Sequence, residues 1–250
     1  MARLTIILLS VLFSSLVWAS EGGYTMHMHV DLSDQKSLQR GARTFVNYCL
    51  SCHSAAYMRF NRLGKDLGIT ESVLKKNLMF GTDKPGDTMT VALRPEDAKR
   101  FFGVVPPDLS VVARARGADW LYTYFMTFYR DPSRPTGVNN LAFKDVGMPH
   151  VLWELQGWQR AVEVEEKEPN GATVEKISHL ELETPPGPKP KAYQGEDYDK
   201  TVKDLVNFLV YLGEPVKLKR YRIGAWVMLY LFVLLIVVYM LKREFWKDVH

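Results

Sequence analysis

Apolar side chains recur at three- and four-residue intervals just before the two cysteines of the chain. The apolar positions are Leu38, Ala42, Phe45, Val46 and Cys49. This spacing is the period of one face of an α-helix. Ser33 or Asp34 precedes the apolar stripe and belongs to the residue types that cap helix N-termini. The pattern predicts an amphipathic helix that starts near residue 34 and carries the first cysteine on its buried face.

Further helices are predicted downstream. Thr70 is a candidate cap for a short helix, and Asp108, after a proline pair that forces extended backbone, is a candidate cap for another. Two aromatic rows in a later segment require a buried helix. The predicted helices cover residues 70–79, 95–102, 111–115, 120–130 and 198–212. We expect loops at 81–86 and 131–140 and a charged, Pro-rich surface excursion at 163–200.

The first nineteen residues lie outside this globular pattern. Arg3 is followed by an apolar run, and Val17-Trp18-Ala19 is a small-x-small sequence. These features predict a secretory signal peptide over residues 1–19, cleaved after Ala19. An uncleaved N-terminal anchor is the alternative, although the run is short for a membrane span.

Residues 223–241 form a second apolar run, and this one contains no charged residue. As a helix it would be about 28 Å long, close to the roughly 30 Å thickness of the hydrocarbon core. Trp226 and Tyr239 lie where interfacial aromatic belts occur. The run predicts one transmembrane helix within an anchor at 217–250. The positive-inside count slightly favours the reverse orientation, but the leader exports residues 20–216, so the C-terminal tail would be cytoplasmic.

Length and composition indicate one ordinary globular core with appendages. The chain has 250 residues, of which 47% are hydrophobic and 24% charged. Of the net charge of +4, residues 217–250 contribute +5 and the leader +1, which leaves −2 for residues 20–216. The basic collar of the anchor suits anionic lipid headgroups. The acidic domain would suit a basic soluble partner, although ordinary solubility also explains so small a charge.

Both cysteines belong to one motif, Cys49-Leu50-Ser51-Cys52-His53. C-x-x-C-H is typical of covalent c-type haem attachment, in which two thiols hold the porphyrin and the histidine ligates iron. A thioredoxin-like redox motif would require a strand–helix context. A structural zinc site would require two more ligands, usually a second Cys/His pair. The motif therefore favours haem.

An electron-transfer haem needs a sixth iron ligand, and methionine thioether is the usual one. Met148 is the preferred candidate because Gly147 and Pro149 fix its loop and because it is distant from His53 in the sequence. His150 is the competing ligand. Arg114 and Arg116 are candidates to bind the haem propionates, and solvent-facing arginines are the alternative.

Two further patterns have an ordinary explanation beside a functional one. Met26-His27-Met28-His29 alternates soft and imidazole ligands that would suit copper or compete for iron, although such a pattern near a terminus usually has no role. The acidic run at 163–168 would serve as a docking patch or simply be a solvated loop.

Over the whole mature chain, an ordered set of segments resembles the cytochrome c1 family. The segments are Gln39-Arg40-Gly41, Cys49-x-x-Cys52-His53-Ser54 with Tyr57 and Arg59, Pro106-Pro107-Asp108-Leu109-Ser110 with Arg114-Ala115-Arg116, Met148-Pro149, Val202-x-Asp204-Leu205, Glu214-Pro215, and the C-terminal span with Lys242-Arg243. The haem motif is common to all c-type cytochromes, whereas this ordered set with a C-terminal anchor is more specific. The chain departs from the family in having Trp120 where members often carry Tyr. It also lacks the extra cysteine pair of some bacterial members.

The resemblance implies a mainly α fold: a c-type cytochrome haem domain with long irregular loops, plus one C-terminal transmembrane helix. It also implies one covalent haem c on Cys49 and Cys52, with His53 and Met148 as axial ligands and Arg116 at a propionate.

The function implied is single-electron transfer within the cytochrome bc1 complex. The electron would come from the Rieske iron–sulfur subunit and pass to a soluble or tethered cytochrome c, with cytochrome b and membrane lipid as further partners and no nucleic acid. The place implied is a bacterial inner membrane, with a single pass and the haem domain in the periplasm.

Two other functions remain open from the sequence. The chain would serve as a stand-alone anchored cytochrome c that donates to an oxidase, or as an anchored thiol-redox or metal-binding protein that uses Cys49 and Cys52 without haem. By resemblance, the 106–110 segment and Glu214-Pro215 favour a subunit of the cytochrome bc1 complex over the stand-alone cytochrome.

Overall fold

A computed structural model describes residues 25–167, 173–183 and 198–247. The predicted leader at 1–19 lies outside the described residues. The elements are α2 (Gln35–Tyr48), β1 (Ala55–Arg59), α3 (Phe60–Leu67), α4 (Glu71–Asn77), β2 (Thr88–Met89), α5 (Pro95–Phe102), α6 (Val112–Arg116), α7 (Ala118–Met126), β3 (Phe128–Arg130), β4 (Val138–Asn140), α8 (Trp153–Gln156), β5 (Gln159–Lys167), β6 (Thr173–Leu182), α9 (Tyr198–Gly213) and α10 (Lys217–Phe245).

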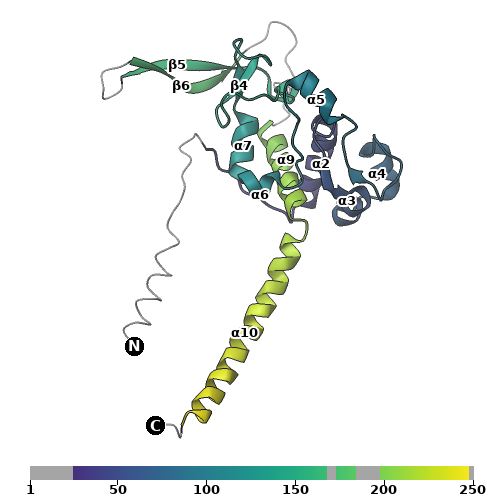
Figure 1. Ribbon diagram of the computed structural model, residues 1–250, viewed down its shortest axis with the longest axis vertical. Helices are drawn as coiled ribbons and strands as arrows, with labels where there is room; N and C mark the ends of the chain where they lie inside the picture. Colours follow the sequence, from purple (N-terminus) through teal and green to yellow (C-terminus); the bar gives the residue numbers. More distant parts are fainter. Residues whose placement is uncertain (1–24, 168–172, 184–197, 248–250) are drawn as a thin grey trace.

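The core of the domain is the packing of α2 against α9, with α6 and α7 beside them (Figure 1). The rings of Phe45 and Phe208 lie 5.5 Å apart between the two long helices. The buried face of α2 contains the predicted apolar stripe, and Asp34 caps the helix by accepting a hydrogen bond from the Ser37 backbone N–H. The mainly α fold and the amphipathic helix before the cysteines are confirmed.

A glycine allows α2 and α9 to approach closely. A Cβ built on Gly41 would lie 2.1 Å from the backbone oxygen of Asp204. Next to it, the Asp204 carboxylate is buried and accepts hydrogen bonds from the Arg40 guanidinium and the Ser37 hydroxyl. The ion pair satisfies a carboxylate that would otherwise be buried without a partner. The Arg40-Gly41 and Asp204 motifs are therefore explained by helix packing.

Three of the smaller predicted helices form as α4, α5 and α6, and two other predictions are wrong. Thr70 caps α4 through its side chain, and α5 covers the predicted 95–102. Asp108 does not cap α6, because its carboxylate accepts hydrogen bonds from the backbone N–H groups of Ala56 and Ser110 instead. The helix predicted over 120–130 ends at Met126, and Phe128–Arg130 forms strand β3, paired with β4.

The charged segment after residue 158 forms a long antiparallel hairpin of β5 and β6, where the sequence predicted a loop excursion. The hairpin joins a four-stranded sheet in the order β4-β3-β5-β6 and projects from the end of the domain that lies away from α10 (Figure 1). Gln159 ties its base to the core by donating to the carbonyls of Met126 and Phe128 at 2.9 and 2.8 Å. The side chains of Glu163 and Glu165 are exposed, which fits both interpretations of the acidic run.

Helix α10 extends from the domain as a single rod (Figure 1). Its most apolar 18-residue stretch has a mean hydropathy of 2.5 and no buried residue, and by length and composition the helix is able to cross a membrane. The predicted span at 223–241 lies inside it.

Candidate haem site

The C-x-x-C-H motif forms a tight turn at the C-terminal end of α2. The backbone N–H groups of Cys52 and His53 both donate to the Cys49 carbonyl, at 3.0 and 2.8 Å. Cys49 is buried and Cys52 is half-buried, and both thiols are free. Burial raises the pKa of Cys49 to about 12. Redox-active cysteines require an exposed thiol whose pKa is lowered. The burial of Cys49 therefore disfavours the thiol-redox interpretation.

His53 is oriented by the proline pair. Its Nδ1 lies 2.8 Å from the backbone oxygen of Pro107, an arrangement in which Nδ1–H donates and Nε2 keeps its lone pair. Burial lowers the pKa of His53, which favours the neutral ring that a metal requires. A backbone acceptor on the distal nitrogen is the usual way in which a ligating histidine is held.

The segment that supplies this acceptor is itself fixed beside the motif. The backbone N–H of Leu109 donates to the Ser54 carbonyl at 2.8 Å, and the backbone N–H of Tyr57 donates to the Ser110 hydroxyl at 3.1 Å. The Asp108 carboxylate binds the Ala56 N–H at 2.9 Å. The 106–110 segment therefore acts as a brace for His53.

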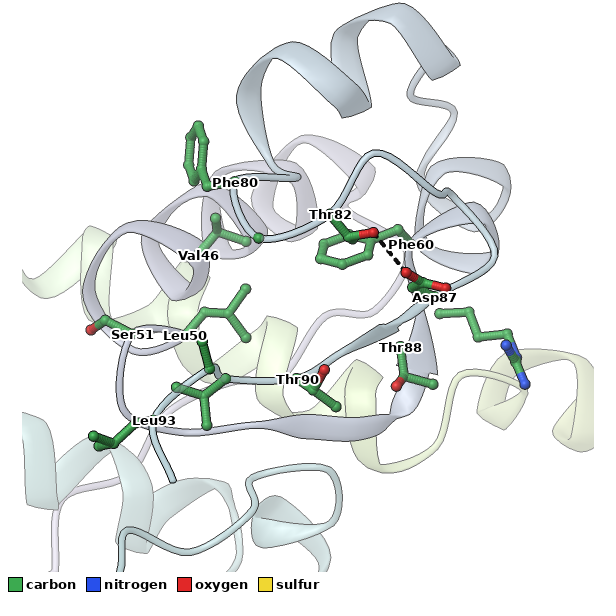
Figure 2. Close-up of a pocket in the computed structure, with 14 residues that line it drawn as sticks. Val46, Leu50, Ser51, Phe60, Phe80, Thr82, Asp87, Thr88, Thr90 and Leu93 are labelled. Atoms are coloured by element: carbon green, nitrogen blue, oxygen red, sulfur yellow. Dashed lines mark hydrogen bonds between the residues drawn. The ribbon is translucent and has the colours of Figure 1, made fainter. Parts of the chain in front are cut away.

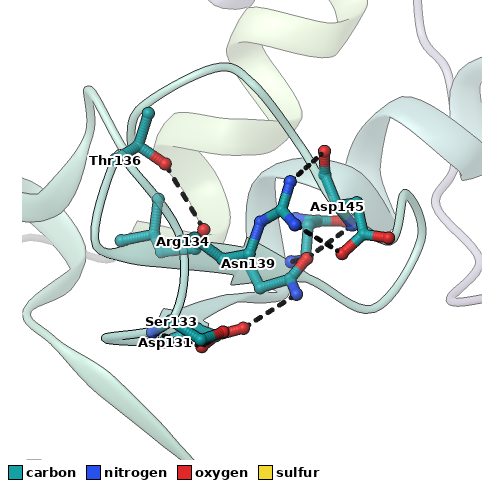
Figure 3. A network of polar contacts seen from close by, with 8 residues as sticks. Asp131, Ser133, Arg134, Thr136, Asn139 and Asp145 are labelled. Atoms are coloured by element: carbon teal, nitrogen blue, oxygen red, sulfur yellow. Dashed lines mark hydrogen bonds and ion pairs between the residues drawn. The ribbon is translucent and has the colours of Figure 1, made fainter.

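The loop that carries Met148 is held by a polar network (Figure 3). The Asn139 side chain donates to Asp131 at 3.0 Å and accepts from the Asp145 backbone N–H at 2.8 Å. Arg134 pairs with the Asp145 carboxylate at 3.0 Å, and Asp145 adopts a left-handed backbone with φ of 62°. The network fixes the backbone just before Met148.

Met148 is half-buried, and the Tyr124 hydroxyl donates to its Sδ at 3.4 Å. Burial raises the pKa of Tyr124, which keeps the phenol protonated as a donor. The ring of Trp120 stacks on Tyr124 at 5.1 Å. The aromatic rows of the sequence predict that these rings are buried, but the helical spacing gives no signal of the bond to sulfur.

The structure separates the two candidate arginines. Both are exposed, and the Arg116 guanidinium lies 4.9 Å from the Trp120 ring centre. Arg114 instead packs at the end of α9, where a Cβ on Gly213 would lie 3.2 Å from its Cγ. Arg116 therefore lies on the side of the site where Trp120 and Tyr124 lead to Met148.

His150, the competing ligand, is packed among aromatic rings. It stacks on Phe128 at 4.9 Å with planes 6° apart and contacts Trp158 edge-on. Burial lowers its pKa to about 4. The Phe128 contact covers one face of the imidazole, and Nε2 is buried without a hydrogen-bond partner among the described residues.

Three apolar side chains near the predicted ligands remain partly exposed. Val104, Val105 and Phe143 are each about half exposed, at 54%, 49% and 44%. A Cβ on Gly147 would lie 3.7 Å from Val104 Cγ2, so the Met148 loop lies against the segment that leads into the proline pair. Two thiols, an imidazole with a free nitrogen, a thioether and an apolar lining together fit a haem.

A cavity of about 670 Å³ adjoins the middle of the motif (Figure 2). Its wall includes Leu50 and Ser51 but none of the predicted haem-binding residues. Thr82 donates to Asp87 across its rim at 2.6 Å. This cavity is therefore distinct from the candidate haem site.

The Met26-His29 segment is bound to helix α7. The backbone N–H groups of Met26 and Met28 donate to the side chains of Thr123 and Asp119, at 2.8 and 3.0 Å. His27 Nδ1 lies 2.8 Å from Asp119. Among the described residues, no group of three or more His, Cys, Asp or Glu side chains is arranged to hold a metal ion. Met26 and Met28 pack partly buried against the core whereas His27 and His29 are exposed, which accounts for the alternation.

The model of the Cytochrome C1 family matches residues 24–178 and 193–249. The chain belongs to the cytochrome c1 family. It is 50% identical to a cytochrome c1 from Allochromatium vinosum, with both chains covered completely. It is 29% identical to a cytochrome c1 from Rhodospirillum rubrum, over 92% of this chain and 91% of the relative.

Another relative has a different name. A protein named ammonia monooxygenase gamma subunit, from Nitrosomonas europaea, is 46% identical over the full length of both chains. Family membership makes this chain a haem-bearing electron-transfer subunit of the bc1 type, with a covalently bound haem c. The resemblance stated from the sequence is thus confirmed.

Proposed function

We propose that Cys49 and Cys52 carry the haem, and that His53 and Met148 are its axial ligands. The observation that carries this assignment is the 2.8 Å contact between His53 Nδ1 and the Pro107 carbonyl, which leaves Nε2 for iron. The fixed Met148 loop adjoins the same segment through Val104. When bound, the haem supplies a one-electron iron couple whose potential a thioether ligand raises.

The function supported best is electron transfer between two protein partners. In this proposal the chain accepts one electron from the Rieske iron–sulfur subunit, beside cytochrome b, and passes it to a soluble or tethered cytochrome c. The chain's part is to bind the haem, to shield it with Val104, Val105 and Phe143, and to fix both ligands before the electron arrives. No side chain needs to act as an acid or base.

A location follows from the anchor. We place the 20–216 domain in the periplasm of a bacterial inner membrane, after removal of the 1–19 leader, with α10 as a single pass and the tail after residue 241 in the cytoplasm. Lys217, Lys219 and Arg220 at the start of α10 would meet anionic headgroups at the outer surface.

A reduced-minus-oxidised spectrum of the native protein, purified in mild detergent, tests this function. A c-type signal in fixed ratio with a b-type signal supports a quinol-oxidising complex. A c-type signal alone would favour the stand-alone anchored cytochrome. Absence of any haem signal would contradict the whole assignment.

Arg116 is proposed to meet a haem propionate, because its guanidinium lies over the Trp120 ring whereas the Arg114 side chain contacts the end of α9. Loss of a positive charge near the haem favours the oxidised iron, so Arg116→Gln should lower the midpoint potential. Arg114→Gln is the matched control and should leave it unchanged. Equal shifts in both variants would remove the special role of Arg116.

A function in ammonia oxidation, suggested by the name of one relative, rests on that name alone. The contacts of His53 and Met148 support haem ligation and electron transfer. The same spectrum separates the two ideas, because a fixed ratio of b-type to c-type haem is a property of the quinol-oxidising complex.

A further inference from the structure

One contact at the proposed methionine ligand is not explained by attachment or ligation. The Tyr124 hydroxyl donates to Met148 Sδ at 3.4 Å, which is within the range for a hydrogen bond to sulfur. Tyr124 is on α7 and Met148 is on a loop 24 residues later. The contact therefore joins the helix on one side of the site to the loop that would ligate iron.

The tyrosine ring is held so that its hydroxyl keeps this direction. Trp120 stacks on one face at 5.1 Å with planes 14° apart. Phe128 meets the ring edge-on at 5.0 Å, and Phe125 does so at 5.5 Å. Tyr124 is only 8% exposed, so its hydroxyl has little access to water. A buried hydroxyl without an acceptor is unfavourable, which makes the bond to sulfur the stable arrangement.

A thioether has two lone pairs, of which iron would use one. The second remains free to accept a hydrogen bond, although sulfur is a weak acceptor. A donor at that position withdraws electron density from the sulfur and weakens its donation to the metal. Oxidised iron depends on this donation more than reduced iron does. Hydrogen bonds around a ligand are among the means by which a protein sets the potential of its metal.

We propose that Tyr124 is a positioning residue for Met148 and that its hydrogen bond to Sδ raises the reduction potential of the haem. The inference rests on the proposed ligation by Met148. The same bond fixes the Met148 side chain, in addition to the Asn139 network that fixes the backbone before it.

The test is Tyr124→Phe in the full-length haem-loaded protein, with the midpoint potential measured by redox titration. The substitution keeps the ring and its stacking and removes only the hydroxyl. We expect the equilibrium constant for reduction to fall by about three- to tenfold, which corresponds to a shift of roughly 30–60 mV for one electron. The ferric methionine–iron charge-transfer band should remain.

Tyr122→Phe is the matched control, because Tyr122 is on the same helix, is equally buried, and donates instead to Asp199. The equilibrium constant for reduction of Tyr122→Phe should stay within twofold of that of the parent. An unchanged or higher potential in Tyr124→Phe overturns the inference. An equal fall in both variants, or loss of the charge-transfer band in Tyr124→Phe, also overturns it.

Met148→Leu separates this failure from failure of the proposed ligation. If the charge-transfer band and the potential survive Met148→Leu, then Met148 is not the ligand, and both proposals fail. If Met148→Leu abolishes the band while Tyr124→Phe leaves the potential unchanged, the ligation stands and only the role of Tyr124 fails.

Discussion

Substitution of Gly41 by alanine tests whether the close approach of α2 and α9 supports the whole haem domain. Added to Gly41, a Cβ would lie 2.1 Å from the Asp204 carbonyl oxygen and 2.7 Å from Phe208 Cβ. Neither neighbour is the tip of a flexible side chain. Relief of the overlap therefore requires the two helices to separate, which disturbs the Phe45–Phe208 contact and the Arg40–Asp204 ion pair together.

Two opposing effects determine the magnitude. Alanine is a better helix former than glycine by about 1 kcal/mol, which alone would stabilise α2. Overpacking of a well-packed core typically costs about 1–3 kcal/mol and occasionally more. Because the clash here is with backbone, we expect the upper end of that range, for a net loss of about 2 kcal/mol. In a chain of this size, such a loss lowers Tm by roughly 4–8 °C.

The assay is thermal unfolding of the haem-loaded chain in detergent, followed by circular dichroism. Gly224→Ala is the control, because it makes the same change in a helix where no neighbour lies within 4 Å of the new Cβ. We expect the control to match or exceed the parent in Tm. A Gly41→Ala variant as stable as the parent would refute the packing argument.

Three further predictions follow from buried polar groups. Arg40→Ala leaves the carboxylate of Asp204, which is 5% exposed, without its cation. We expect denaturant titration to show a free energy of unfolding lower by about 2–4 kcal/mol. This loss is smaller than for a fully buried pair because Arg40 is partly exposed. Asn139→Ala removes the contacts to Asp131 and Asp145, and should weaken the ferric methionine–iron band without releasing haem. Burial holds the pKa of His150 at about 4, below its usual value near 6.5. As pH falls between these two values, the unfolded chain binds a proton that the folded chain does not. The free energy of unfolding should therefore fall by up to about 3 kcal/mol over that window in the parent and not in His150→Phe. A flat difference between these two proteins would contradict the assignment of His150 as a neutral buried ring.

The sequence predicts best the parts of the fold that depend on local spacing. The amphipathic stripe of α2, the Thr70 cap and the apolar run inside α10 each carry their signal within a few turns. The cofactor was predictable for the same reason, since C-x-x-C-H is a local motif. The sequence could not predict the contacts between residues that are distant along the chain. Asp108 has the type and position of a helix cap, but it binds a backbone amide 52 residues earlier.

The hairpin was missed for a different reason. Residues 159–167 carry a partial alternation, with valines at 162 and 164 between glutamates, and Asn170-Gly171 is a hairpin-turn signal in the sequence. The high charge and the prolines at 185–188 instead favour an irregular surface excursion. The charges are compatible with a strand because the hairpin projects from the domain, and because Arg160 pairs with Glu181 across the two strands at 2.7 Å.

The arrangement at the haem site has an energetic consequence for its proposed role. His53 is fixed by the Pro107 carbonyl, and Met148 is fixed by the Asn139 network and by Tyr124, all through contacts within the protein chain. Ligands held in this way by their own supporting hydrogen bonds need not move when the iron changes its charge. Preorganised groups avoid reorganisation at the moment of reaction. The segments that distinguish the family from other c-type cytochromes therefore include the brace for one of the two proposed ligands.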